Sequence, residues 1–137
     1  MKKSRIRHIA LAAEDPDKTA EFYRRVFGFE EVGRISKEKG KLAYGVMLTD
    51  GVLNIAVLRF TSDQGPRTTD FRGIHHFGVQ VEDVDGDTKT IESLGGECFL
   101  RKPEGATMAF FETKFVGPDG VVFDITDHPW VGNPPDA

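Results

Sequence analysis

The sequence predicts an α+β protein built from two βαβββ modules, which together form a curved, barrel-like mixed sheet with helices outside. The main observation is an internal repeat, in which IRHIALAAEDPD at 6–17 aligns with IHHFGVQVEDVD at 74–85 and five of the twelve positions are identical. In both copies apolar residues alternate with a period of two, which is typical of a strand. An acidic turn then follows in each copy, where a helix is expected to begin.

The helices and the remaining strands are predicted from local signals. The stretch DPD at 15–17 predicts a helix start with proline in the first turn, and Gly28 predicts the end of that helix. The second helix is expected at about 85–94, ahead of two consecutive glycines. After each helix the pattern indicates three strands, near 29–35, 42–49 and 52–59 in the first copy and near 97–101, 107–116 and 121–126 in the second.

The repeat places the whole chain, 1–137, in a single domain. Module one spans about 1–60, a polar linker 61–73, module two about 74–127, and a tail 128–137. A chain of 137 residues is long enough to bury a stable core without disulfides or structural metals.

The composition narrows the functional classes. The net charge of −4 offers no basic surface for nucleic acid, and the apolar stretches are too short to span a membrane. Cys98 is the only cysteine, which excludes an intramolecular disulfide and a cysteine-rich zinc site and suits a reducing compartment. We therefore expect a cytoplasmic protein that acts on a small molecule, with neither nucleic acid nor membrane as a partner.

Two histidines occupy equivalent positions of the repeat. Alternation along the first strand of each module sends His8 and His76 to the concave face of the sheet, away from the helices. By the same alternation His75 points the other way, together with Arg7, and is expected to be a solvated residue at the strand entry. A single histidine on a strand is usually a hydrogen-bonded core residue, whereas a symmetric pair favours a binding site.

Polar residues on neighbouring strands complete the candidate site. Asp124 stands between Phe123 and Ile125, where a carboxylate is costly unless it is paired or binds a cation. Asn54 faces the same side on the last strand of module one. Two imidazoles and one carboxylate with open positions form the ligand set of non-haem iron(II) or manganese(II) sites. The alternative is a neutral hydrogen-bonded cluster of these side chains in an apolar ligand pocket.

Other aromatic residues are assigned to packing. Tyr44, Phe110, Phe111 and Phe115 are expected in the core. His128 and Trp130 follow the last strand and are expected to close one end of the sheet.

Three segments carry a family resemblance: RHIALAAEDPDKTAEFYRRVFGF, IHHFGVQVEDVD and FVGPDGVVFDIT. Together they resemble the vicinal oxygen chelate superfamily, which includes glyoxalase I, methylmalonyl-coenzyme A epimerase, type I extradiol dioxygenases, fosfomycin-resistance transferases and bleomycin-binding proteins. The resemblance covers nearly the whole chain and implies paired βαβββ modules, a divalent metal in the concavity and frequent dimers. It implies His8, His76 and Asp124 as the metal ligands.

The chain departs from this family at two positions. Many members carry glutamate where this chain has Asp124, and the shorter side chain reaches less far. Glyoxalase I and the epimerase usually carry glutamate or glutamine on the last strand of module one, where this chain has Asn54, and an amide cannot act as a general base. In a glyoxalase-like mechanism Glu112 or His128 would have to replace it.

The prediction is a metal-dependent small-molecule enzyme that binds its substrate through two neighbouring oxygens, most like an extradiol dioxygenase. Iron(II) or manganese(II) is favoured as the divalent metal ion, with zinc or nickel as other candidates, and Asn54 and Gln80 are expected to line the substrate pocket. One alternative is a glyoxalase- or epimerase-like lyase or isomerase, and another is a metal-free small-molecule binding protein of the resistance type. A homodimer is expected, and no catalytic residue is assigned.

Overall fold

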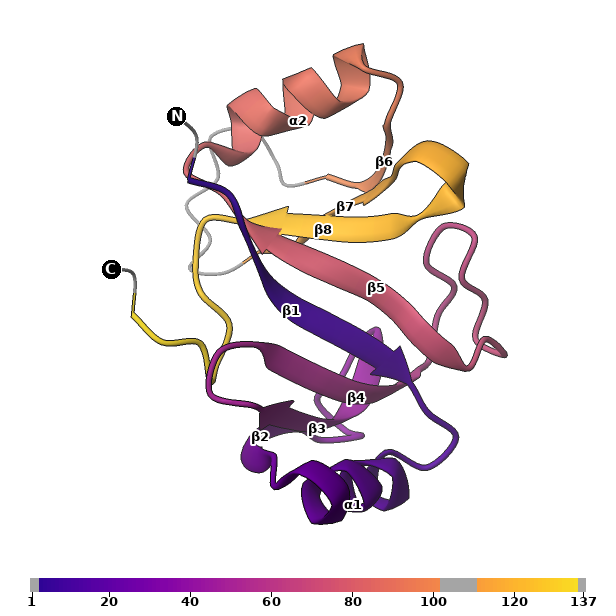
Figure 1. The fold of residues 1–137 in the computed structure, drawn as a ribbon. Coiled ribbons are helices and arrows are strands. Elements are labelled where there is room, and N and C mark those ends of the chain that lie inside the picture. The colour runs from indigo at the N-terminus through magenta and orange to yellow at the C-terminus, as the bar shows by residue number, and fades with distance from the viewer. Residues whose placement is uncertain (1–2, 102–110, 136–137) are drawn as a thin grey trace.

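The computed structural model describes residues 3–101 and 111–135 (Figure 1). Its elements repeat the order β-α-β-β-β. They are β1 (Arg5–Ala12), α1 (Pro16–Phe27), β2 (Glu30–Ile35), β3 (Ala43–Thr49), β4 (Asn54–Phe60), β5 (Gly73–Gln80), α2 (Val84–Ser93), β6 (Glu97–Leu100), β7 (Thr113–Val116), a 3-10 turn (Pro118–Gly120) and β8 (Val122–Thr126). Of the strand predicted at 107–116, the part at 113–116 is confirmed, 111–112 are not strand, and 102–110, including Phe110, lie outside the described residues.

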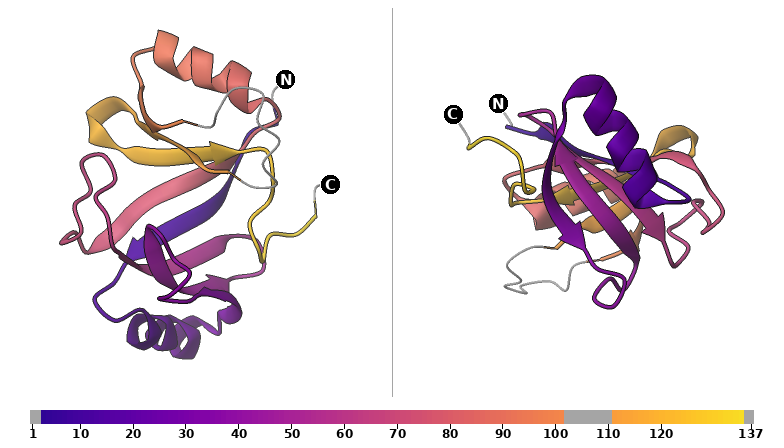
Figure 2. Two further views of the ribbon diagram at one scale, coloured as in Figure 1. Left: turned by 180° about the vertical axis from the view of Figure 1, so that it is seen from behind. Right: turned by 90° about the horizontal axis from the view of Figure 1, so that it is seen from below.

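The eight strands form one mixed sheet in the order β2-β3-β4-β1-β5-β8-β7-β6. At its centre β1 pairs antiparallel with β5, and on either side β1 pairs parallel with β4 and β5 pairs parallel with β8. The two modules are therefore related by an approximate two-fold arrangement about the β1–β5 pair. The sheet curves but stays open, since β2 and β6 are its edges, and both helices lie outside it (Figures 1 and 2). The predicted fold class is confirmed.

Both helices begin at the acidic turns that the sequence indicates. The Asp15 carboxylate accepts a hydrogen bond from the Lys18 backbone N–H, and the Asp83 carboxylate accepts one from Gly86. Helix α1 ends at Gly28, whose φ of 75° is the left-handed conformation that glycine adopts readily. None of the helices in the described part of the chain is both long and apolar enough to cross a membrane.

Among the described residues, three hydrophobic clusters lie on the two faces of the sheet. Two of them pack the helices onto the outer face, one beneath α1 around Leu48 and Val57 and one beneath α2 around Phe115 and Ile125. The third lies on the concave face and consists of Ala10, Ala12, Ala43, Ala56, Leu58 and Phe60. Because four of these six residues are alanines, the concave face leaves space above the sheet.

Two β-bulges interrupt the central β1–β5 pair. The pairing skips Arg7 on β1 and His75 on β5, which are equivalent positions of the repeat. Each bulge places two successive side chains on the concave side, so that Arg7 is buried beside His8 and His75 beside His76. The prediction that His75 is a solvated strand-entry residue is wrong, because the bulge breaks the alternation on which it was based; only 1% of its surface is exposed.

Candidate metal centre

Three predicted ligands meet on the concave face of the sheet. His8 on β1, His76 on β5 and Asp124 on β8 come from three strands that are neighbours in the sheet. All three are buried, and one ligand atom from each lies within 4.8 Å of the others. Gly78 makes this approach possible, because a Cβ at that position would lie 2.5 Å from Asp124 Oδ1. The structure therefore brings together the set that the sequence predicts.

Asn54 orients the first histidine. His8 Nδ1 lies 2.7 Å from Asn54 Oδ1, while Asn54 Nδ2 donates a hydrogen bond of 2.8 Å to the Val131 carbonyl. This second bond identifies the amide oxygen as the acceptor toward the ring, so that His8 Nδ1 carries the proton. The lone pair of His8 Nε2 then points into the site, as a metal ligand requires.

His75 holds the second histidine in the same way. His75 Nδ1 and His76 Nδ1 are 2.7 Å apart, and the His75 ring stacks on Phe60 with centroids 3.7 Å apart. Burial, with further contributions from His76 and Lys114, lowers the pKa of His75 to about 3, so the ring is neutral near pH 7. The Nδ1 atom of a neutral His75 can accept a hydrogen bond from the protonated Nδ1 of His76. His76 Nε2 then carries a lone pair that can bind a cation.

Asp124 is ionised and forms an ion pair with a buried lysine. Lys114 Nζ lies 3.0 Å from Asp124 Oδ2 and 3.6 Å from Glu112 Oε1. Burial alone would raise the pKa of Asp124, but the Lys114 ammonium and the His76 ring outweigh burial and lower it. Burial likewise opposes the charged form of Lys114, but the carboxylates of Asp124 and Glu112 raise its pKa.

Sequence reasoning missed Lys114, although a signal for it exists. The turn at 117–121 joins β7 to β8 as an antiparallel pair, and its register sets Lys114 directly opposite Asp124. Counting back from that turn would have placed an ammonium beside the predicted ligand.

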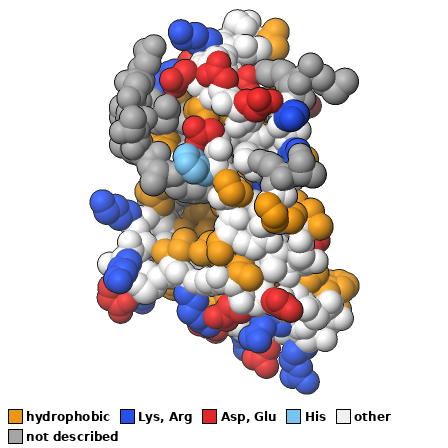
Figure 3. Space-filling model, turned by 90° about the vertical axis from the view of Figure 1, so that its left-hand side faces the viewer, with side chains coloured by type: hydrophobic (Ala, Val, Ile, Leu, Met, Phe, Trp, Pro, Cys, Tyr) orange, Lys and Arg blue, Asp and Glu red, His pale blue; other side chains and the backbone are white. Residues whose placement is uncertain are grey.

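A cavity of about 430 Å³ opens beside the three ligands. His8, His76, Glu112, Lys114 and Trp130 line one side of it. Most of the remaining lining is apolar, with two basic residues, and comprises Ile35, Lys39, Gly40, Lys41, Leu42, Ala43, Met47, Ala56, Leu58, Phe60 and Gln64. Figure 3 shows a hollow with hydrophobic side chains on one side of the molecule and basic side chains beside it.

The tail after β8 closes one end of this cavity. The Trp130 indole stacks on the His8 ring at 4.8 Å, and its Nε1 donates a hydrogen bond of 2.9 Å to Glu112 Oε2. Asn133 holds the tail in place by donating to the backbone carbonyls of Arg7 and Val52. Trp130 therefore takes the closing position expected of it, whereas His128 lies at the surface.

The two predicted substrate-binding residues have other contacts. Asn54 binds His8 and the tail, and Gln80 accepts a hydrogen bond of 3.1 Å from Arg7. Neither is among the described residues that line the cavity. Their part in substrate binding stays a prediction, while Asn54 has a clear role in orienting a candidate ligand.

The side chains fit a divalent cation. His8 Nε2, His76 Nε2 and Asp124 Oδ1 are buried and accept no hydrogen bond within the described part of the chain, and the polar atom next to His76 Nε2 is Asp124 Oδ2 at 3.1 Å, another candidate ligand atom. Unsatisfied buried polar atoms are costly and need an explanation. Two imidazole nitrogens and one carboxylate oxygen are donors that iron(II), manganese(II), zinc and nickel accept.

Comparison with known proteins assigns the family. A sequence profile of the Glyoxalase/Bleomycin resistance protein/Dioxygenase superfamily, the vicinal oxygen chelate proteins, matches residues 5–125. The chain therefore belongs to this superfamily. A search of curated proteins finds no match.

Solved structures of methylmalonyl-CoA epimerases share the fold. A Streptomyces coelicolor epimerase in complex with 2-nitronate-propionyl-CoA is 27% identical, with a TM-score of 0.70 over 89% of this chain and 95% of that one. Another epimerase, in complex with methylmalonyl-CoA and NH4+, is 26% identical, with a TM-score of 0.72 over 96% and 99%. A hypothetical protein from Bacillus halodurans, 16% identical over 94% of this chain and 97% of that one, has a TM-score of 0.74 and shows the fold alone.

Proposed function

We propose that this chain is a divalent-metal-dependent enzyme that binds a small molecule through two neighbouring oxygens and moves a proton at a carbon next to a carbonyl. The observation that carries the proposal is the set of three unsatisfied, buried ligand atoms beside a cavity with a carboxylate in its wall. The two similar solved structures at 26% and 27% identity are epimerases, which favours proton transfer over the dioxygenase chemistry ranked first from sequence. His8, His76 and Asp124 would hold the metal, which supplies Lewis-acid polarisation of the substrate oxygens when bound.

Glu112 is the best placed proton acceptor among the described residues. It lines the cavity, and its Oε2 lies 3.9 Å from His8 Nε2. Trp130 and Lys114 hold its two oxygens, which fixes the carboxylate in one orientation. The apolar walls exclude water from a bound substrate and strengthen these polar interactions.

Metal content and deuterium exchange test the proposal. Protein purified without added metal, and protein reconstituted with iron(II), manganese(II), zinc or nickel, should hold one ion per chain, and His76→Ala should lose it. Glutathione hemithioacetals and 2-methyl acyl thioesters should take up deuterium from D2O with wild type but not with Glu112→Gln. Absence of bound metal under all four ions would refute the metal-dependent enzyme.

A second candidate is an extradiol dioxygenase. It is favoured by the ligand set itself, because two histidines and one carboxylate leave positions open for a catecholate and dioxygen on iron(II). Ring cleavage of catechols by the iron(II)-loaded protein under air, followed by absorbance, distinguishes this candidate from proton transfer.

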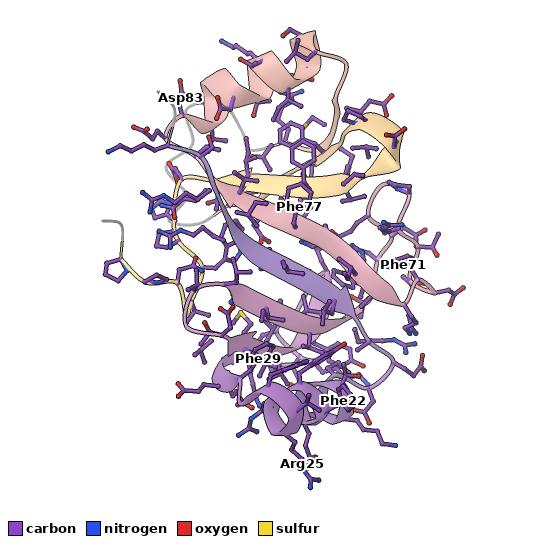
Figure 4. The ribbon with its side chains drawn as sticks, viewed as in Figure 1. Phe22, Arg25, Phe29, Phe71, Phe77 and Asp83 are labelled. Carbon is purple, nitrogen blue, oxygen red and sulfur yellow. The ribbon has the colours of Figure 1, made fainter. Side chains whose placement is uncertain are left out.

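We also infer that two copies pair through the outer face of β1 and β5. The side chains that this face presents are all apolar, and none is fully buried in the single chain: Ile6, Ile9, Leu11, Ile74, Phe77 and Val79. Helices α1 and α2 flank this face but do not cover it, and Figure 4 shows Phe77 between them. An exposed apolar stripe of this kind is typical of a protein interface.

The oligomeric state tests this pairing. Ile74 is 67% exposed, and the Ile74→Lys variant should be a monomer. Its molar mass is measured by light scattering after size-exclusion chromatography. Leu94→Lys is the matched control, since Leu94 is 82% exposed at the C-cap of α2 and is not part of the stripe. A wild-type monomer would refute the pairing.

The cytoplasmic location stays a prediction.

A further inference from the structure

Lys114 is an unusual residue for the centre of a metal site. Its side chain is 6% exposed, and its ammonium lies 3.0 Å from a predicted metal ligand. Transfer of an ammonium from water into a protein interior is strongly unfavourable unless paired carboxylates offset it. Here Asp124 and Glu112 provide those carboxylates, so the ammonium is held firmly among the residues that would bind a metal.

The two modules can be compared at the position of Lys114, because they are related by an approximate two-fold arrangement. Lys114 pairs with Asp124 across β7 and β8, and Met47 pairs with Ala56 across β3 and β4. Ala10 and Gly78 occupy equivalent positions of the repeat. Ala10 pairs with Ala56 in the sheet, and Gly78 pairs with Asp124, so Ala56 is the counterpart of Asp124. Module one thus carries a methionine where module two carries Lys114, and both line the cavity.

A divalent ion and this ammonium compete for the same carboxylate, that of Asp124. Asp124 Oδ2 lies 3.0 Å from Lys114 Nζ and 3.1 Å from His76 Nε2, so an ion bound to His76 and Asp124 would come within a few ångströms of Lys114. Like charges at about 4 Å repel strongly in a buried site. The ammonium therefore opposes metal binding for as long as it stays beside Asp124.

We propose that Lys114 is a built-in cation that neutralises Asp124 in the metal-free protein and sets the affinity of the site for divalent metal. The proposal rests on the metal site of the proposed function and assigns a residue that determines how tightly the ion is bound. In the metal-free state Lys114 keeps the buried carboxylate stable. With a metal bound, Glu112, whose Oε1 is 3.6 Å from the Lys114 ammonium, would remain as its partner.

The affinity of the protein for Mn2+ and Zn2+ tests this role. Calorimetry, or competition with a chelating dye, should give a dissociation constant at least about tenfold lower for Lys114→Met than for wild type. Lys114→Arg, which keeps the positive charge, should bind no more tightly than wild type. Lys89→Met is the control for the loss of one charge, since Lys89 is exposed on α2, and it should leave the affinity unchanged.

The melting temperature, measured with and without metal, is an independent test of whether Lys114 and a divalent ion replace each other beside Asp124. Without Lys114 the buried Asp124 carboxylate has no cation, so Lys114→Met should melt lower than wild type in EDTA and recover with Zn2+. If the methionine variant does not fold without metal, Lys114→Gln, which can still donate a hydrogen bond to Asp124, replaces it in both measurements.

Failure of this inference is distinguishable from failure of the proposed function. If wild type binds metal through His76 and neither neutral Lys114 variant binds more tightly, the role of Lys114 is refuted and the metal enzyme stands. If metal binds only once Lys114 is neutral, the competition is supported, while wild type is a metal-free protein. If no variant binds Mn2+ or Zn2+, both ideas fail.

Discussion

Gly78 allows the metal ligands to approach each other, and a single methyl group at this position should disturb them. A Cβ there would lie 2.5 Å from Asp124 Oδ1 and 2.7 Å from two ring atoms of Trp130. Neither neighbour can yield easily, because Asp124 is fully buried and paired with Lys114, and the Trp130 ring is stacked on His8. Overpacking of this kind costs about 1–3 kcal/mol, which lowers the melting temperature of a domain of this size by about 3–12 °C.

Urea unfolding followed by tryptophan fluorescence measures this cost directly. Trp130 is the only tryptophan, so its emission reports on the site as well as on unfolding. Gly78→Ala should lower the urea midpoint and shift the emission of the folded state. Gly33→Ala is the control, because its Cβ would meet mainly the flexible end of Met47. If the two variants have equal midpoints and unchanged emission, Gly78 does not provide the space that the site needs.

The buried His75 makes stability depend on pH. Its pKa is about 3 in the folded chain and 6.5 when unfolded, so the unfolded state binds more protons between these values and stability falls as the pH drops below about 6.5. The urea midpoint of His75→Phe should therefore fall less steeply from pH 6.5 to 4 than that of wild type; equal slopes would contradict this. Asp15→Ala removes the N-cap of α1 and should cost about 1 kcal/mol in the same assay, while Asp17→Ala, on an exposed position of the first turn, should cost less.

The sequence was sufficient for the parts of the structure that depend on local pattern. Capped helices and alternating strands gave the two modules, and the repeat gave the equivalence of His8 and His76. It failed where pairing between strands decides the outcome. A bulge adds one residue without changing composition, so the burial of His75 could not be found by alternation. The contact of Lys114 with Asp124 likewise depends on the register of β7 against β8.

The register between strands also determines which residues each module contributes to the site. By face, Asn54 resembles the counterpart of Asp124, but the pairing in the sheet makes Ala56 that counterpart and leaves Asn54 beside His8. At these equivalent positions module one presents the apolar pair Met47 and Ala56, whereas module two presents an ion pair. An apolar wall facing a charged one suits a substrate with a hydrocarbon body and two oxygens, because each end then meets groups of its own polarity. The small side chain of Ala56 leaves room on the cavity side of the three candidate ligands, which is where such oxygens would approach a bound metal.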